Sequence, residues 1–276
     1  PGRRPVMQAA LFLVLLGGVI VTLFPLTWML VTAFTPNELV FRGGTSLIPP
    51  DVTTDNFASA FRIQPVGAWI FNSVVTSVAI GGGKMLLAIP AAFAFAHFEF
   101  RGRNFLFMLV VVTMTIPYVI TLIPTYLGIV QIGWYNSYLG AIVPSAAFCG
   151  FATFFLRQAF MILPRELFEA AGIDGATPFQ MLVMIALPNS KSAVASLAVL
   201  SFLSAWNLYL WPQIVLDDPE MKTLAIGLKL FATSQEQLQQ WGPLMATALI
   251  GLLPAIFIFV FAQRYLIDGF VNSGIK

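Results

Sequence analysis

Charged side chains and the residues of common catalytic sites are scarce in this chain. Only 9% of its 276 residues are Asp, Glu, Lys or Arg, and 58% are hydrophobic. Ordinary soluble domains carry about 25% charged residues, so this supply cannot cover a water-facing surface. The composition therefore predicts a membrane protein. The single cysteine, Cys149, lies in an apolar run and excludes an internal disulfide, so we expect a small packing residue.

The scarcity of reactive residues also limits the possible activities. His97 is the only histidine, and no nucleophile–base pair or metal-ligand cluster accompanies it. The net charge of +2 is too small to indicate nucleic-acid binding. The run Gly81-Gly82-Gly83-Lys84 lacks the Gly-x4-Gly-Lys-[Ser/Thr] spacing of a phosphate loop and lies in an apolar stretch. We expect no enzyme, no ATP hydrolysis and no cofactor or metal held by this chain.

Long apolar runs are what the chain has instead. A spanning helix needs roughly 20 mostly apolar residues. Six stretches qualify, at about 9–34, 69–96, 105–130, 138–160, 191–214 and 243–264. The first is too long and proline-interrupted for a cleavable signal peptide. We predict an all-α membrane protein, with one transmembrane domain over residues 1–276 and six spans.

The distribution of charge predicts the orientation of these spans. Cytoplasmic loops of membrane proteins carry an excess of Lys and Arg. With the N-terminus inside, nine cations lie inside (Arg3, Arg4, Arg101, Arg103, Arg157, Arg165, Lys191, Arg264 and Lys276). Four lie outside (Arg42, Arg62, Lys222 and Lys229), and Lys84 lies within a span. Both termini and the loop at 161–190 are therefore expected in the cytoplasm.

The loop between the fourth and fifth spans is polar and has an ordered pattern. Pro164 suits the first position of a short helix, where its missing N–H would be unpaired anyway. Gly172 and Gly175 are expected to end that helix. Thr177-Pro178 has the form of an N-cap and a first-turn proline, beginning a second helix that ends before Pro188. The sequence predicts two short helices around a glycine turn.

The spacing within this loop resembles a known motif. Glu169-Ala170-Ala171-x3-Gly175-x9-Ile185-x-Leu187-Pro188 resembles the EAA loop of ABC-importer permease subunits. The resemblance implies a coupling helix that docks in a groove of a separate ATPase subunit, with Glu169 and Asp174 free to form salt bridges. It also implies that a side chain at Gly175 would clash with that partner. Composition alone favours the alternative, an amphipathic elbow resting on the membrane surface.

The resemblance extends along nearly the whole chain. Phe98-Glu99-Phe100-Arg101-Gly102-Arg103, Ile116-Pro117 and Ile173-Asp174-Gly175-Ala176 look like the second, six-span permease of maltose-type carbohydrate-uptake systems. The run Trp206-Asn207-x-Tyr209-Leu210-Trp211-Pro212 looks like the six-span subunit of the glycerol-3-phosphate/glycerophosphodiester importer. The narrower family implies a phosphate-bearing solute, and the broader one implies a di- or oligosaccharide such as trehalose or maltose.

The family also implies the partners. These are a homologous second permease, two ATP-binding subunits that hold ATP and Mg, an extracytoplasmic solute-binding lipoprotein, and the lipid of a bacterial inner membrane. A secondary transporter is the rival class. It would show inverted repeats or broken helices in equivalent halves, and none is visible in the sequence.

Residues that contact the solute are harder to assign. The candidates are Tyr118, Thr121, Trp206, Asn207, Tyr209 and Lys84. Aromatic residues near a membrane end often form an interfacial belt, and Trp211 fits that alternative equally well. The Asn207 amide has two roles open to it, bonding another helix or bonding the solute. Lys84 is the only cation deep in a span, and it either meets a phosphate, snorkels or bonds a carbonyl.

Overall fold

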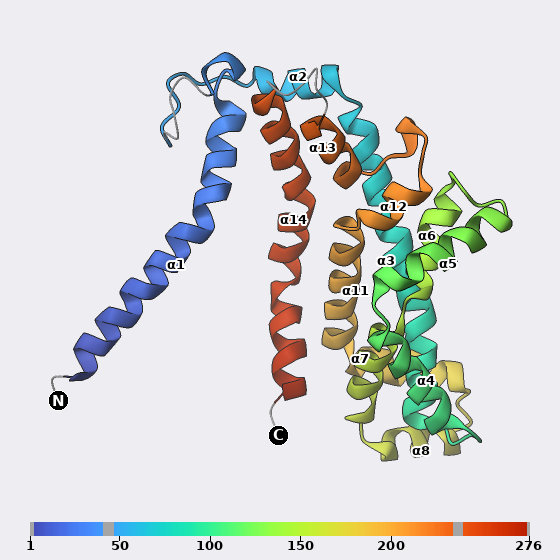
Figure 1. Cartoon of the computed structure of the whole chain (residues 1–276). Helices are drawn as coiled ribbons and strands as arrows, with labels where there is room; N and C mark the ends of the chain where they lie inside the picture. Colours follow the sequence, from blue (N-terminus) through green and yellow to red (C-terminus); the bar gives the residue numbers. More distant parts are fainter. Residues whose placement is uncertain (1–2, 41–46, 234–239, 275–276) are drawn as a thin grey trace. The chain divides into compact units, whose positions relative to one another are not determined.

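The computed structural model describes residues 3–40, 47–233 and 240–274, and every regular element in these ranges is a helix (Figure 1). Three helices are long and apolar enough to cross a membrane, and the number rises to six if each bent pair counts as one span. That number agrees with the six predicted spans. Arg42 and Lys276, which entered the charge count, lie outside the described residues, as do the side chains of 264–276.

Contacts divide the chain into two compact units, 1–67 with 227–254, and 68–226 with 255–276. The first unit holds α1 (Arg3–Phe34), η1 (Asn37–Leu39), α2 (Asp55–Ile63), most of α13 (Leu224–Thr233) and the first turns of α14 (Trp241–Gly274). The Asn56 amide donates to the Ala33 carbonyl (3.0 Å) and the Thr35 carbonyl (2.6 Å), so α2 caps the end of α1.

The second unit contains the segment that resembles the EAA loop. Its helices are α3 (Val66–His97), α4 (Arg103–Thr115), α5 (Tyr118–Gln131), α6 (Tyr138–Ala147), α7 (Gly150–Met161), α8 (Arg165–Ile173), α9 (Pro178–Met181), η2 (Leu182–Ala186), α10 (Leu187–Asn189), α11 (Lys191–Trp206), α12 (Leu210–Val215) and η3 (Pro219–Met221). Helix α7 packs against α4 and α11. Helices α5, α6 and α12 gather at one end of this unit, and α8 lies at the other (Figure 1).

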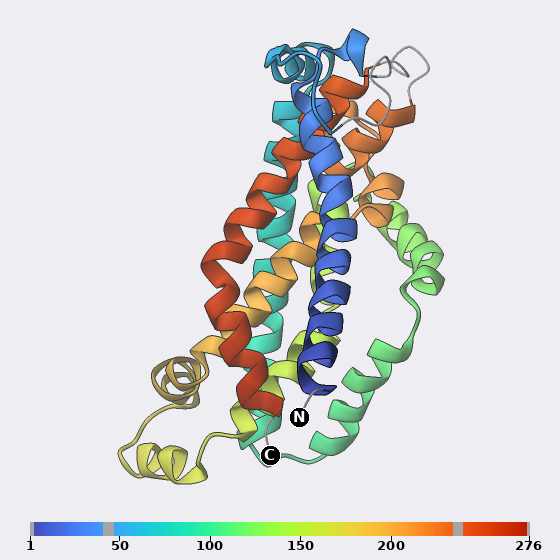
Figure 2. The same cartoon turned by 90° about the vertical axis from the view of Figure 1, so that its left-hand side faces the viewer.

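Three of the predicted spans are broken. The predicted span 105–130 bends by 102° between α4 and α5 (Figure 2). Pro117 has no N–H, and its ring disfavours helical backbone at Ile116, which is extended (φ −76°, ψ 119°). The span 138–160 bends by 43° between α6 and α7, and the span 191–214 is interrupted between α11 and α12. The hydropathy of these runs predicted the spans, and the structure adds the breaks within them.

The predicted helices of the coupling loop also need three corrections. Pro164 is the N-cap of α8 and not its first residue, because its backbone is extended (φ −58°, ψ 132°). Gly172 lies inside α8 and does not break it. The second helix does not end before Pro188. It continues through the π-helix η2 into α10, because the wide π turn relaxes the i to i−4 pattern that a proline would interrupt.

Candidate functional site

The segment Glu169–Pro188 forms a helix, a glycine turn and a second helix (Figure 2). The Gly175 N–H donates to the Gly172 carbonyl (3.1 Å), and the Ala176 N–H donates to the Ala171 carbonyl (2.9 Å). This pair of bonds is the Schellman motif, which satisfies carbonyls at a helix C-terminus. The motif needs a left-handed residue just beyond the helix, and Gly175 has φ +80°. The chain's own geometry therefore explains the glycine.

A capping box begins the second helix, as Thr177-Pro178 predicted. The Thr177 side chain accepts a bond from the Gln180 N–H (3.3 Å), and the Thr177 N–H donates to the Gln180 side chain (2.8 Å). Pro178 occupies the first turn. Helices α9 to α10 then meet α11 at 86° across Ser190. Reciprocal caps of this kind fix where a helix starts, so the turn holds α8 and α9 in a defined relation.

One side of this segment is open to solvent. Glu169, Ala170, Asp174, Gly175 and Pro188 are all exposed. The two most exposed apolar side chains among them are Ile173 at 88% exposure and Phe179 at 72%, followed by Met184 at 70%. Exposed apolar groups rimmed by polar residues mark interaction surfaces. Sequence reasoning missed both, although each is an apolar residue in the polar part of the loop.

The other side of α8 is anchored in the helical core. Phe168 is the buried residue of α8, and its ring lies 3.9 Å from the His97 ring, centroid to centroid. It also lies 5.8 Å from the Phe93 ring, which meets Phe160 edge-on. Phe168 thus belongs to a buried cluster that includes residues of α3 and α7. Ile185 and Leu187 pack against the same cluster, and Ala171 is half-buried. A displacement of α8 would act directly on α3 and α7.

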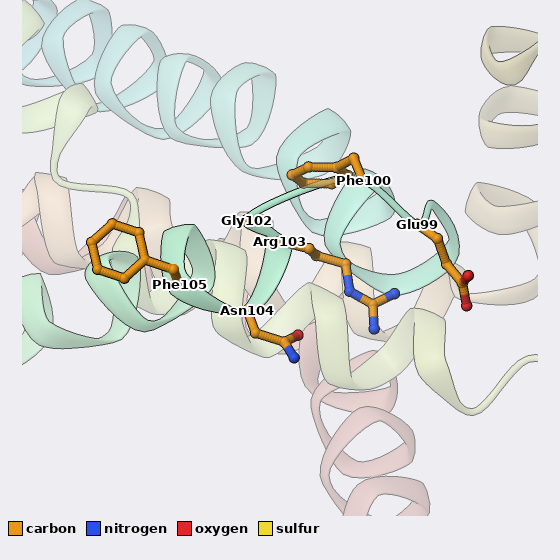
Figure 3. A pocket seen from close by; sticks show the side chains of 6 residues that line it. All are labelled: Glu99, Phe100, Gly102, Arg103, Asn104 and Phe105. Carbon is orange, nitrogen blue, oxygen red and sulfur yellow. The ribbon is translucent and has the colours of Figure 1, made fainter.

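Two pockets lie near the end of α3, and the first of them borders Phe168. One, of about 340 Å³, is lined by Phe93, His97, Phe98, Glu99, Arg103, Arg165, Phe168, Glu169 and Met181. The other, of about 310 Å³, surrounds the 99–105 turn, where the Glu99 and Arg103 side chains lie on the side opposite Phe100 (Figure 3). Among the described residues there is no cluster of His, Cys, Asp and Glu that could hold a metal. Acidic and basic side chains both line these pockets, and such a mixed lining suits contact with a protein surface.

The predicted solute residues fall in different places. Tyr118 and Thr121 line a small pocket of about 40 Å³, together with Leu122, Thr125, Pro144, Ser145, Phe148 and Trp211. Trp206 is 7% exposed and stacks on Phe202. The exposed Asn207 amide donates to the Leu203 carbonyl of its own helix (2.8 Å). Tyr209 precedes α12 and is half-buried. The structure brings Tyr118 and Thr121 together, whereas the other four candidates, Trp206, Asn207, Tyr209 and Lys84, lie outside that pocket's lining.

Trp211 is not an interfacial belt residue. It is 1% exposed, and its indole N–H donates to the Gly140 carbonyl (3.0 Å). With Leu122, Ile129 and Val215 it forms a buried cluster that joins α5, α6 and α12. The alternative is therefore wrong, because the break after α11 turns α12 inward against α6.

Asn72, on α3, links this helix to two further segments, the start of α6 and residues 220–222. Its amide N–H groups donate to the Glu220 carbonyl (2.6 Å) and the Lys222 carbonyl (3.0 Å). Its oxygen accepts a bond from the Tyr138 hydroxyl (2.7 Å). The neighbouring Ser73 oxygen accepts from the Leu224 N–H (2.8 Å). These side chains satisfy the backbone of the segment that follows α12.

Comparison with known proteins identifies the family. Residues 85–271 match the family described as binding-protein-dependent transport system inner membrane component. The chain belongs to this family. An sn-glycerol-3-phosphate transport system permease protein, UgpE, of Brucella abortus (strain 2308) is 34% identical over 278 residues, covering 98% of each chain. The resemblance to ABC-importer permeases that the EAA spacing indicated is thus confirmed.

Two further similarities agree with this assignment. An arabinooligosaccharides transport system permease protein, AraQ, of Halalkalibacterium halodurans is 34% identical over 259 residues, covering 93% of this chain and 92% of that one. A chain of the crystal structure of a bacterial ABC transporter involved in the import of alginate superposes with a TM-score of 0.86, at 22% identity, over 96% of this chain and 98% of that one. The fold is that of an ABC-importer permease.

Proposed function

We propose that this permease forms half of the translocation pathway of an ATP-driven importer for a solute of the glycerol-3-phosphate type. The observation that carries the proposal is the segment Glu169–Pro188, which presents exposed Ile173 and Phe179 on one side and anchors Phe168 on the other. Such a segment suits a coupling helix between a motor and the spans. The relatives named for glycerol-3-phosphate transport support the solute.

The partners follow from the same proposal. A homologous second permease completes the pathway, and two ATP-binding subunits supply ATP and Mg. An extracytoplasmic lipoprotein delivers the solute, in keeping with the family's dependence on a binding protein. The charge count supports a multi-pass arrangement with both termini in the cytoplasm. The chain itself is a transport subunit, and catalysis belongs to the ATPase.

Coupling would run through the contacts of α8. Closure of the ATPase subunits on ATP displaces α8, and Phe168 transmits the movement to α3 and α7. Because packed cores have discrete arrangements, a small shift can switch the spans between inward-open and outward-open states. The breaks near Pro117 and after Trp206 lie where such spans can hinge. Glu169 is exposed at the pocket beside α8, where it can bond a basic side chain of the ATPase.

Five polar or aromatic residues are our candidates for the solute path. Tyr118 and Thr121 follow the bend after α4, and Trp206, Asn207 and Tyr209 flank the break after α11. Irregular backbone within a span is tolerated where it lines a cavity or is buried in protein. A phenol, a hydroxyl and an amide next to such breaks suit a polyol. A saccharide would also fit, and the relative named for arabinooligosaccharides favours that second solute class.

The solute class can be tested with the complete transporter. The complex of both permeases and the ATPase is reconstituted in proteoliposomes with its binding protein. We expect sn-glycerol-3-phosphate to stimulate ATP hydrolysis and to accumulate inside the vesicles. Arabinooligosaccharide, maltose and trehalose should do neither. Stimulation by a saccharide and not by glycerol-3-phosphate would establish the sugar importer in its place.

Docking of the ATPase makes a separate prediction for Ile173. We expect Ile173→Glu to weaken association with the ATPase subunits about 10- to 100-fold, because an apolar anchor of this size contributes roughly 1.5–3 kcal/mol when buried. Affinity is measured by titrating detergent-purified permease with the ATPase. Ile48→Glu is the matched control, since Ile48 is similarly exposed (79%) but lies in the loop that follows the first span. Equal affinities for the two variants would remove Ile173 from the interface.

A further inference from the structure

Lys84 occupies the inward face of α3. The buried residues of this helix recur every three or four positions and include Ile80, Ala88 and Ala92. Lys84 falls four residues after Ile80 and four before Ala88, so it lies in the same stripe. Side chains in that stripe point toward the other helices of the unit and not toward lipid. A cation at this point faces the interior of the permease.

Glycines bring two other helices close to this position. A Cβ atom at Gly81 would lie 3.4 Å from the Phe202 backbone nitrogen of α11. A Cβ atom at Gly83 would lie 2.8 Å from the Ala146 Cβ of α6. Cys149, at the break between α6 and α7, follows Ala146 by three residues, so this break lies close to Gly83 and Lys84. Lys84 therefore stands beside a broken span, near the middle of α3 (Val66–His97).

Within the described part of the chain the Lys84 ammonium forms no hydrogen bond and no ion pair. Arg157, which lies near the cytoplasmic end of the predicted span 138–160, has contacts within its own chain. Its Nε donates to the Phe95 carbonyl (3.2 Å), and its guanidinium lies 4.0 Å from the Phe107 ring centroid. An uncompensated charge within a span is costly and marks a functional position. Arg157 is bound by its own chain, whereas Lys84 is not.

We propose that Lys84 is a specificity-determining residue that binds the phosphate group of the solute during translocation. A lysine ammonium is a compact charge with three donors that binds phosphate well. A neutral saccharide carries no negative charge that could compensate an unpaired cation on the inward face. The inference rests on the proposed function and deepens it, because it assigns the anion to a residue of this chain.

The test uses the complete complex in proteoliposomes with its binding protein. We expect Lys84→Met and Lys84→Gln to lower the rate of sn-glycerol-3-phosphate uptake about 10- to 100-fold, which is the range of a charged hydrogen bond. Lys84→Arg keeps the charge and should retain most of the rate. Lys191→Met is the matched control, because Lys191 is exposed at the start of α11, and its uptake should equal that of the wild type. Size-exclusion chromatography verifies that each variant assembles with its partners.

Two outcomes would overturn the inference. Wild-type uptake by Lys84→Gln would show that the ammonium does not meet the phosphate, while the proposed function would stand. Equal loss in assembled Lys84→Gln and Lys84→Arg complexes would show that the charge is not what matters. Failure of the proposed function would be recognised by a different result, because the wild-type complex itself would then transport a saccharide and no phosphate ester.

Discussion

Gly175→Asp is expected to leave the permease inserted and assembled but to lower solute-stimulated ATP hydrolysis and uptake at least tenfold. Asp is among the few residues that adopt left-handed backbone, so the turn at φ +80° should survive. A Cβ atom at Gly175 meets nothing within 4 Å of the chain itself. The cost would therefore arise at the ATPase, where a carboxylate is buried without a partner. Burying an unpaired charge costs several kcal/mol, and 1.4 kcal/mol is already tenfold.

Gly175→Asn separates charge from size at the same position. Asn has nearly the same shape and tolerates the same backbone, but it adds no charge. We expect its transport to lie between those of the wild type and Gly175→Asp. Rates of ATP hydrolysis and of uptake are measured on the same vesicles, so that the ratio of solute moved to ATP hydrolysed is obtained. Normal transport by Gly175→Asp would contradict the role of this turn as a lever against the ATPase.

Gly140→Ala should destabilise the permease by about 3 kcal/mol. A Cβ atom at Gly140 would lie 2.2 Å from the Trp134 carbonyl oxygen and 3.1 Å from methyl groups of Ile129 and Val215. A backbone carbonyl cannot move aside as a flexible side chain can, so α6 must shift. That shift also disturbs the bond from the Trp211 indole to the Gly140 carbonyl. Overpacking a core costs typically 1–3 kcal/mol, and a lost buried hydrogen bond costs a similar amount.

Gly128→Ala provides the comparison, because a Cβ atom at Gly128 in α5 would meet nothing within 4 Å. Thermal unfolding of the purified permease, followed by tryptophan fluorescence, should show a lower midpoint for Gly140→Ala and an unchanged or higher one for Gly128→Ala. Trp211 reports directly on the affected cluster. Identical midpoints for the two variants would mean that α6 can adapt to the extra methyl group.

The helical membrane class and the coupling loop could be predicted because their signals are local. Low charge and long apolar runs depend on composition alone. The cap at Thr177-Pro178 and the left-handed turn at Gly175 depend on residues within a few positions of each other. Local preferences of this kind survive in the fold because the surrounding contacts agree with them.

The breaks in the spans could not be predicted in the same way. Hydropathy averages over about a span's length, so it does not distinguish a straight helix from two halves at 102°. Pro117 gave a local signal for one break, whereas no proline marks Phe148 or Cys149, where α6 ends and α7 begins. The burial of Trp211 depends on α6, which lies some 70 residues earlier in the chain. Contacts over such distances have no signature in a single sequence.

The amide of Asn72 has a consequence for biogenesis. Two of its partners, Glu220 and Lys222, lie 148 and 150 residues later in the chain. At a synthesis rate of roughly 5–20 residues per second, they emerge roughly 7 to 30 seconds after Asn72. During that interval α3 is in the membrane with those donor bonds unmade. The segment at 220–222 therefore joins α3 late in synthesis, and a truncation before Glu220 would leave the Asn72 amide without these two acceptors.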